Sequence, residues 1–515
     1  MNGGSLTHGT SGIVLAYITT AVPLAAAMIQ RQVKMRGLIL VPFAAIPASL
    51  VGALISGFLI SFLRLPSGTE TVMSILLGTA ACIFSGYAAG VLLMRQPRLF
   101  GDTHARGTVV RAAPAKARTN PGAITLAGIE IPPLDETKHF KLIGTTGSGK
   151  STAIRELLSG ALARGDRAII ADPDGVYLQH FYRASRGDVI LNPFDERSAR
   201  WDLFAEIDQP YDVEQLARSL IPEGPDPSGH EWRGFARTFL SSVLEYFKVE
   251  DKTDLDELWR LLVIADAEEL SNVLAGTAAQ PFLAEGATKM LHSIRGTATP
   301  VLNSLKYAKG RGGDPLSIRN WVRNGRGVLF LPYKAGQIAA LRQLIATWLR
   351  LAIFETMNGP EGDQHLWFAI DELDALGQID GLKDALARLR KFGGRCIIGF
   401  QSIAQVRGTN GDSDAQTIVE NTGTTVVLRC SASERGGTAE FASRLIGKRQ
   451  VVRKQISRSR PDRLGGSAQE TRTTSEHHVT EDAVMASEIE QLPDLEGFLK
   501  LASSPEWLRI RIERT

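Results

Sequence analysis

Eight consecutive residues, Gly144 to Ser151, carry the clearest chemical signal in this chain of 515 residues. They read GTTGSGKS and match the phosphate-binding pattern G-x-x-x-x-G-K-[ST] at every fixed position. The glycines let the backbone curl around a phosphate so that successive N–H groups point inward. In this pattern Lys150 reaches the β and γ phosphates, and Ser151 holds Mg²⁺. The predicted nucleotide-binding residues are Gly144, Thr145, Thr146, Gly147, Ser148, Gly149, Lys150, Ser151 and Thr152.

The segments on either side of this loop support the same interpretation. Phe140 to Ile143 is a short apolar run that predicts a strand entering the loop, and Thr152 to Ala163 has the pattern of a helix leaving it. The start of a helix adds partial positive charge where the phosphates bind. A chance glycine-rich turn is the alternative, and the order of strand, loop and helix disfavours it. The sequence therefore predicts ATP and Mg²⁺ as cofactors.

An acidic pair follows a second predicted strand. The run Leu366 to Ile370 is apolar throughout, and Asp371 and Glu372 come directly after it. Ligands bind at the carboxyl ends of the strands in open α/β sheets. Asp371 is therefore expected to orient Mg²⁺ together with Ser151, and Glu372 is expected to act as general base toward the attacking water. A solvated loop is the alternative for two adjacent acidic residues, and the phosphate-binding loop elsewhere in the chain disfavours it.

Two further positions are candidates for chemistry at the γ-phosphate. Gln401 follows the predicted strand Arg395 to Phe400 and is expected to sense the γ-phosphate, by analogy with water-orienting glutamines. A hydrogen bond to a nearby loop is the alternative role for this side chain. The predicted helix 382–391 ends in Arg388, Arg390 and Lys391, one of which could reach a neighbouring subunit as an arginine finger. The residues alone favour a basic helix C-terminus that suits the helix dipole.

Three other clusters give weaker signals. Asp172 and Asp174 form a turn after a strand, and they could either line the nucleotide cleft or cap the following element. The pair His477 and His478 lacks the spaced ligands of a metal site, and none is predicted there. Basic residues between 448 and 463 indicate a flexible loop, for which phosphate contact without base reading and a solvated surface are equally open.

Short apolar runs separated by helical pattern predict a doubly wound α/β domain with a buried parallel sheet. The expected strands are 140–143, 168–172, 189–191, 327–331, 366–371, 396–400 and 424–428. Between 208 and 314 the strand pattern stops and amphipathic segments follow one another, which predicts an all-helical insertion. Residues 101–120 are rich in basic and small residues and are expected to form a linker.

The first hundred residues contain three apolar runs without a charged residue, which are Gly12 to Gln30, Gly37 to Leu63 and Val72 to Met94. Each is long enough to cross a membrane, although the first is diluted by polar residues. Basic residues between the first two runs and after the third place those segments, and the nucleotide site, in the cytoplasm. The expected division is a transmembrane region 1–100, a nucleotide-binding domain 101–207 and 315–515, and an all-α domain 208–314.

Composition adds two limits. The net charge of +3 is too small to indicate a partner by itself. The three cysteines include no C-x-x-C pair, so neither a zinc site nor a disulfide framework is predicted. No helix-turn-helix, zinc finger or other sequence-reading module is recognisable.

The motifs together resemble a known family. The apolar runs, GTTGSGKS, the helical insertion, FAIDELDAL and IIGFQS occur in the order found in the conjugative coupling proteins of type IV secretion systems, the TraD/TrwB class. The stretches RGDRAIIADPDG, VILNPFD, LSIRNW and LPDLEGFL add to the resemblance, which covers nearly all of the chain after the apolar runs. Family members usually have two membrane helices, whereas this chain has three apolar runs.

The resemblance implies a RecA-like P-loop NTPase domain with an inserted all-α domain, preceded by transmembrane helices. It further implies a homohexamer in the bacterial inner membrane that hydrolyses ATP, binds DNA without sequence specificity, and links the relaxase–DNA complex, or relaxosome, to inner-membrane components of the secretion channel. By position it assigns Lys150 and Ser151 to the P-loop, Asp371 and Glu372 to the acidic pair, and Gln401 to the γ-phosphate sensor. Arg390 matches the family's trans-acting arginine, although the bulky Leu389 before it departs from the pattern.

Two alternatives keep the fold and change the function. A chromosome-segregation translocase of the FtsK class shares membrane spans and a RecA-like motor, but the helical insertion and the absence of a winged-helix reader disfavour it. A substrate receptor or scaffold would use ATP only to control assembly. A DNA-stimulated ATPase that serves conjugation is the favoured hypothesis.

Overall fold

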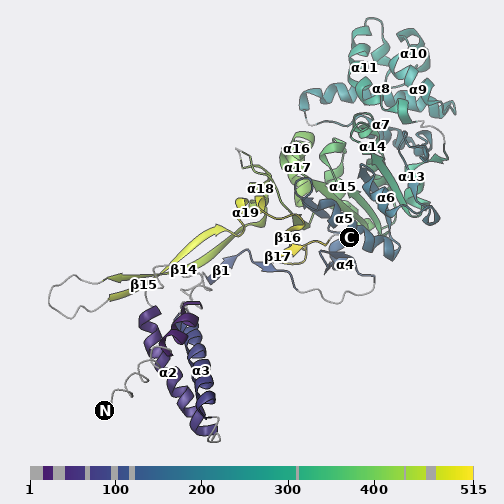
Figure 1. The fold of residues 1–515 in the computed structure, drawn as a ribbon. Helices are drawn as coiled ribbons and strands as arrows, with labels where there is room; N and C mark the ends of the chain where they lie inside the picture. Colours follow the sequence, from purple (N-terminus) through teal and green to yellow (C-terminus); the bar gives the residue numbers. More distant parts are fainter. Residues whose placement is uncertain are drawn as a thin grey trace, which may run out of the picture. The chain divides into compact units, whose positions relative to one another are not determined.

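The computed structural model describes residues 16–26, 41–63, 70–93, 103–114, 122–224, 226–308, 313–362, 364–433, 436–459 and 471–513. The chain separates into two compact units. The first contains residues 1–104 and 451–479, and the second contains residues 105–450 and 480–515. Figure 1 labels the elements along the chain.

A ten-stranded sheet is the framework of the second unit, with strand order β2-β17-β16-β13-β5-β12-β11-β6-β10-β7. The seven predicted strands are present as β5 (Phe140–Ile143), β6 (Arg167–Pro173), β7 (Val189–Ile190), β10 (Val328–Tyr333), β11 (Leu366–Ile370), β12 (Gly394–Phe400) and β13 (Thr424–Val427). Neighbours among these seven are all parallel. The strands β2 (Val110–Ala112), β16 (Glu496–Lys500) and β17 (Trp507–Arg511) extend the sheet, and the sequence analysis did not predict them.

Both faces of this sheet are buried, which explains why its strands read as apolar without alternation. Along β6, Ile169 and Ala171 pack into one hydrophobic core, whereas Ala168 and Ile170 pack into the other. The surrounding helices are α4 (Pro133–Glu136), α5 (Lys150–Arg164), α6 (Val176–Phe181), α13 (Ile318–Asn324), α14 (Ile338–Asn358), α15 (Leu382–Leu389), α16 (Ile403–Asn410), α17 (Asp412–Glu420), α18 (Gly437–Ile446) and α19 (Ala486–Glu490).

The register of the central strands brings their carboxyl ends to one edge. Ile370 of β11 pairs with Ile398 of β12 and with Ala171 of β6, and Phe400 of β12 pairs with Ile143 of β5. The residues that follow these four strands therefore meet at this edge, where open α/β sheets bind ligands.

A helical segment interrupts the α/β order between β8 (Arg200–Trp201) and β9 (Pro315–Leu316), which pair in parallel. Its helices are α7 (Pro210–Leu220), α8 (His230–Val249), α9 (Leu255–Val263), α10 (Ala267–Val273), α11 (Thr288–Leu302) and α12 (Leu305–Ala308). Figure 1 shows α8 to α11 grouped together. Their apolar side chains belong to the same core as α14 and one face of the sheet.

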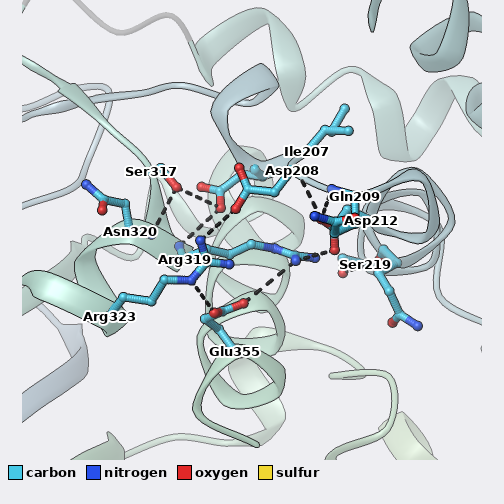
Figure 2. A network of polar contacts seen from close by, with 12 residues as sticks. Ile207, Asp208, Gln209, Asp212, Ser219, Ser317, Arg319, Asn320, Arg323 and Glu355 are labelled. Carbon is cyan, nitrogen blue, oxygen red and sulfur yellow. Dashed lines mark hydrogen bonds and ion pairs between the residues drawn. The ribbon is translucent and has the colours of Figure 1, made fainter. Parts of the chain in front are cut away.

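A polar network joins α7 to the helices on the return side of this segment (Figure 2). Arg319 of α13 forms an ion pair with Asp212 of α7, and both side chains are buried. Arg323 contacts Glu355 of α14 at 2.5 Å and Asp208 at 2.6 Å. The buried charges are thus compensated by partners on neighbouring elements, as burial of charge requires. The network ties the points where the chain leaves and re-enters the α/β fold.

The first unit includes a helix over 16–26, α2 (Val41–Leu63), which contains Pro47, and α3 (Glu70–Leu93). These helices fall within the three predicted apolar runs, except that α3 begins two residues before its run. A search of the described helices finds none that is long and apolar enough to cross a membrane.

Two predictions about irregular segments are wrong. Residues 103–107 and 110–112, expected within a linker, form the strands β1 (Thr103–Gly107) and β2. The basic segment expected to be a loop forms β14 (Lys448–Ser459), which lies between β1 and β15 (Thr471–Asp482) in a three-stranded sheet. The predictions from composition were wrong in both cases because backbone pairing with a distant strand can hold a polar segment in an extended conformation. Residues 460–463 of the basic segment lie outside the described residues.

Candidate functional site

The predicted phosphate-binding loop connects the end of β5 to the start of α5, which begins at Lys150. Gly147 and Gly149 have φ values of +76° and +117°, which side chains with a Cβ rarely adopt. A Cβ at Gly149 would also lie 2.9 Å from Cδ2 of Leu495, a residue far along the chain. The backbone N–H of Leu495 donates to the carbonyl of Ser148 at 2.9 Å. The segment before β16 therefore packs directly on the loop.

Ser151 and Asp371 meet at the edge of the sheet. The hydroxyl of Ser151 donates to Oδ2 of Asp371 at 2.6 Å, although the two residues are 220 positions apart. A hydroxyl and a carboxylate are oxygen ligands of the kind that Mg²⁺ takes in nucleotide sites. These two side chains therefore fit a magnesium ion.

Lys150 lies at the base of the loop, and its side chain is largely buried. Its Nζ donates to the carbonyls of Gly144 at 2.7 Å and Thr145 at 3.4 Å. Burial lowers the pKa of Lys150, while the negative charges of Asp371 and Glu372 oppose that shift. The ammonium group is held by backbone oxygens at the position from which phosphates of a bound nucleotide would be reached.

Glu372 and Gln401 are in direct contact. Nε2 of Gln401 donates to Oε1 of Glu372 at 2.7 Å, and Oε1 of Gln401 accepts from the hydroxyl of Thr146 at 2.9 Å. Burial raises the pKa of Glu372, and the hydrogen bond from Gln401 opposes that shift. Gln401 thus connects the phosphate-binding loop to the carboxylate that was predicted as general base.

A cavity of about 350 Å³ lies over these groups. It is lined by Thr146, Gly147, Gly149, Lys150, Ser151, Thr152, Arg155, Asp371, Glu372, Gln401, Asp494 and Leu495. Three other predicted loop residues lie beside it rather than on its wall. Gly144 supplies a carbonyl to Lys150, Thr145 lines a neighbouring cavity, and the buried Ser148 donates to the carbonyl of Thr145.

Among the residues predicted to be catalytic, Arg390 does not line this cavity. It is exposed in the short 3-10 helix Arg390–Phe392, which precedes β12, whereas Gln401 follows the carboxyl end of the same strand. The seven residues of β12 lie between them, and strands rise about 3.3 Å per residue. Arg390 therefore lies at the opposite end of β12 from the nucleotide cavity.

Sequence reasoning missed four residues at the site. Tyr177 of α6 donates its hydroxyl to Oδ2 of Asp371 at 2.8 Å. Arg155, Asp494 and Leu495 line the cavity. Of these four, only Arg155 could have been predicted from its position in the sequence, because it lies about one turn into the helix that follows the loop. The others reach the site through long-range packing.

Asp172 acts as a cap. Its carboxylate accepts the backbone N–H groups of Tyr177 at 3.0 Å and Leu178 at 2.7 Å, at the start of α6. Burial raises the pKa of Asp172 to about 6, while these hydrogen bonds oppose the shift. Asp174 adopts a φ of +59° and lines a separate cavity beside β10. The capping alternative is therefore correct for Asp172, and neither aspartate lines the nucleotide cavity described above.

Comparisons with known proteins agree with this geometry. The family model described as "Type IV secretion-system coupling protein DNA-binding domain" matches residues 123–513. The coupling protein TraD of Escherichia coli K12 is 32% identical over 379 residues, which cover 71% of this chain and 51% of TraD. Protein VirD4 of Rhizobium radiobacter is 24% identical over 188 residues, covering 33% of this chain and 27% of VirD4. The chain thus spans about half the length of TraD.

Solved structures of the plasmid coupling protein TrwB match the fold. The complex of TrwB with the non-hydrolysable ATP analogue ADPNP has a TM-score of 0.71 and 31% identity, over 80% of this chain and 95% of TrwB. The complex of TrwB with ADP and Mg²⁺ has a TM-score of 0.71 and 32% identity, over 81% of this chain and 95% of TrwB. These matches confirm the predicted RecA-like domain with an inserted all-α domain.

Proposed function

Because this chain belongs to the coupling proteins of type IV secretion systems, we propose that it is a DNA-dependent ATPase that delivers a relaxase–DNA substrate to the secretion channel during conjugation. The observation that carries the proposal is the 2.6 Å contact between Ser151 and Asp371. It joins the phosphate-binding loop to the acidic strand end, which is the arrangement that hydrolysis of a nucleoside triphosphate requires. TrwB structures with ADPNP and with ADP and Mg²⁺ support ATP and Mg²⁺ as the cofactors.

Four polar side chains of the cavity have distinct roles in this proposal. Lys150 neutralises the β and γ phosphates, and the loop N–H groups hold them in place. Ser151 and Asp371 would hold Mg²⁺, which when bound would offset the charge that develops on the phosphate oxygens. Glu372 polarises the attacking water, and its raised pKa makes it a stronger base than an exposed glutamate.

The neighbouring subunit completes the site in this proposal. Arg390 lies exposed on the part of the chain away from its own cavity, so it can act only on the nucleotide of another subunit. An arginine supplied in trans stabilises the charge of the transferring phosphoryl group. This arrangement supports a ring of subunits, for which we propose a homohexamer. Gln401 would report the presence of the γ-phosphate to the rest of the subunit.

DNA is proposed as the substrate that stimulates hydrolysis. The matching family model is described as a DNA-binding domain. We propose contacts to the phosphate backbone, which carry no sequence information. The relaxosome and the inner-membrane components of the type IV secretion system are the proposed protein partners. The all-α domain, within 208–314, is proposed as the part that faces the incoming substrate, between the two parts of the nucleotide-binding domain, 101–207 and 315–515.

The N-terminal region, residues 1–100, is proposed as a multi-pass anchor in the bacterial inner membrane, with the bulk of the chain cytoplasmic. Three uncharged apolar runs in the sequence support this assignment. Large apolar side chains on α2 and α3 are exposed, among them Leu54 at 74% and Phe84 at 70%. A lipid bilayer would cover such side chains, whereas water would not favour them.

The test is the ATPase rate of the full-length protein in detergent, measured with and without single-stranded DNA. Lys150→Ala is expected to abolish hydrolysis, whereas Lys334→Ala, at an exposed lysine that does not line the nucleotide cavity, is expected to leave it unchanged. Activity that survives Lys150→Ala, or a rate indifferent to DNA, would refute the proposal. A deletion that impairs cell division and not conjugation would favour the FtsK-class alternative.

The scaffold alternative has its own test. Glu372→Gln keeps the size of the side chain and removes the base, so it is expected to lower kcat by roughly 10²–10⁴-fold while ATP still binds. Transfer of DNA in cells carrying this variant at the normal rate would favour an ATP-controlled receptor without motor activity. Loss of transfer together with hydrolysis is the result expected for a motor.

A further inference from the structure

The carboxylate of Asp371 receives two hydrogen bonds on the same oxygen. Oδ2 accepts the Ser151 hydroxyl at 2.6 Å and the Tyr177 hydroxyl at 2.8 Å. The other oxygen, Oδ1, is buried and has no hydrogen-bond partner among the described residues. It lies against Gly399 of β12, where an added Cβ would be 3.2 Å from Oδ1. Oδ2 is therefore the oxygen that faces the loop, and Tyr177 is bonded to that oxygen.

Both the side chain and the backbone of Tyr177 are held in place by their contacts. Its side chain is 1% exposed and packs in the hydrophobic core beneath the sheet. Its backbone N–H donates to Asp172, the last buried residue of β6, which lies next to β11 in the sheet. Asp172 and Asp371 end adjacent strands, and Tyr177 spans the two. Because the sheet register fixes β6 and β11 relative to each other, the Tyr177 hydroxyl lies against Asp371.

The two donors on Oδ2 differ chemically. The Tyr177 hydroxyl donates to Asp371 from a buried ring, and the proposed function gives it no role as a ligand. In the proposed function Ser151 would itself be a ligand for Mg²⁺, through its hydroxyl oxygen. The Ser151 hydroxyl would therefore serve both the metal and Asp371, whereas the Tyr177 hydroxyl would serve to orient the Asp371 carboxylate.

We propose that Tyr177 is a positioning residue that holds the Asp371 carboxylate in the orientation needed to bind Mg²⁺ with the nucleotide. This inference rests on the proposed function, because it assigns a role toward the same metal. Groups that hydrogen-bond to metal ligands commonly change metal affinity by roughly 10–100-fold when they are removed. Tyr177 does not touch the phosphates, so its effect acts through Asp371.

The experiment compares the full-length protein with Tyr177→Phe, which removes the hydroxyl and keeps the ring. Binding of Mn²⁺, a paramagnetic substitute for Mg²⁺, is measured in the presence of ADP by electron paramagnetic resonance. The variant is expected to bind Mn²⁺ about tenfold more weakly, and to bind ADP without metal within about twofold of the wild type. In the ATPase assay its Mg²⁺ requirement is expected to rise by a similar factor, with kcat recovered at saturating Mg²⁺.

Two further variants separate the hydrogen bond from packing. Tyr182→Phe removes a hydroxyl five residues away that has no hydrogen-bond partner among the described residues, and is expected to change neither measurement. Tyr177→Leu removes ring and hydroxyl together, and is expected to lose as much metal affinity as Tyr177→Phe and more thermal stability. Metal affinity that falls only in Tyr177→Leu, in step with stability, would assign Tyr177 a purely structural role and overturn the inference.

The outcomes also distinguish the inference from the proposed function. Wild-type protein that binds Mn²⁺ with ADP but shows no DNA-stimulated hydrolysis would refute the proposed function, while a weakened Tyr177→Phe would still support the positioning role. Wild-type protein that hydrolyses ATP, together with a Tyr177→Phe variant that binds Mn²⁺ normally, would refute the positioning role alone.

Discussion

Gln401 donates its side-chain N–H to Glu372 across 2.7 Å, from the end of β12 to the end of β11. The same amide accepts from Thr146 in the phosphate-binding loop at 2.9 Å. The proposed general base is therefore engaged by the proposed sensor, and the sensor is engaged by the loop. A γ-phosphate arriving at the loop would compete for Thr146 and for Gln401. We expect this competition to release Glu372 toward the attacking water only when ATP is bound.

The first prediction concerns this link. Gln401→Ala is expected to lower kcat by about 10–100-fold, because the water and the base lose their common partner, while the affinity for ATP stays within about threefold. Single-turnover hydrolysis and equilibrium nucleotide binding measure the two quantities separately.

The control for this substitution is Gln416→Ala, which removes an exposed glutamine of α17 that bonds only to Glu420 in its own helix. It is expected to leave both quantities unchanged. If Gln401→Ala hydrolyses ATP at the wild-type rate, Gln401 has no role in sensing the γ-phosphate.

The second prediction concerns the exposed Arg390. Arg390→Ala is expected to lower kcat by about 10³-fold or more with normal ATP binding, as loss of an arginine finger does. Mixed assemblies of Arg390→Ala and Lys150→Ala subunits are expected to regain part of the activity, because one subunit supplies the arginine and its neighbour supplies an intact cavity.

Arg388→Ala is the matched control, since Arg388 is exposed two residues before Arg390. It is expected to behave like wild type. Mixed assemblies that remain as inactive as either variant alone would show that the arginine does not act across subunits.

The third prediction concerns the space beside Asp371. A Cβ at Gly399 would lie 2.3 Å from the carbonyl oxygen of Asp371, so the two strands must separate to admit it. Gly399→Ala is expected to destabilise the fold by about 1–3 kcal/mol through overpacking. It is also expected to weaken binding of Mn²⁺ with ADP, because it displaces the backbone that carries Asp371.

Gly408→Ala is the comparison for stability. Apart from the neighbouring residues and the backbone of its own helix, no atom lies within 4 Å of a Cβ at that position in α16. Alanine is also the better helix former by about 0.5–1 kcal/mol. In urea unfolding, the midpoint of Gly408→Ala is expected at or above that of the wild type, and the midpoint of Gly399→Ala is expected below it. Equal midpoints for Gly399→Ala and wild type would contradict the contact.

The fourth prediction is a pH dependence of stability. Nδ1 of His139 accepts the backbone N–H of Cys396 at 3.1 Å, and Nε2 faces the carbonyl of Leu386 at 2.9 Å, so the ring is held neutral. Burial lowers the pKa of His139 to about 4. Below pH 6.5 His139 takes up a proton in the unfolded chain but stays neutral in the folded protein. The contribution of His139 to the free energy of unfolding is therefore complete above pH 6.5. It is lost as the pH falls toward 4, by up to about 3 kcal/mol.

Urea unfolding between pH 7 and pH 4 measures this loss. His139→Gln is expected to flatten the dependence over that range, because it removes the titrating group. His292→Gln, at an exposed position of α11, is expected to follow the wild-type curve. A wild-type curve parallel to that of His139→Gln would assign the acid sensitivity to other residues.

The sequence alone identified the phosphate-binding loop, the acidic pair and the seven parallel strands. Each of these is a local pattern. Glycines at fixed spacing before Lys150 report a backbone conformation, and an unbroken apolar run such as Leu366 to Ile370 reports a strand buried on both faces. The order of these patterns along the chain was also enough to indicate the helical insertion and the family.

Tertiary structure alone decided which distant groups complete the site. Tyr177 reaches Asp371, and Leu495 packs on Gly149, through contacts between segments far apart in sequence. The basic segment at 448–459 is extended because β1 and β15 pair with it, although its composition is typical of a loop. Such features depend on sheet order and on strand register. A local pattern cannot encode them, because hydrogen bonding and packing between elements are satisfied only after the chain has folded.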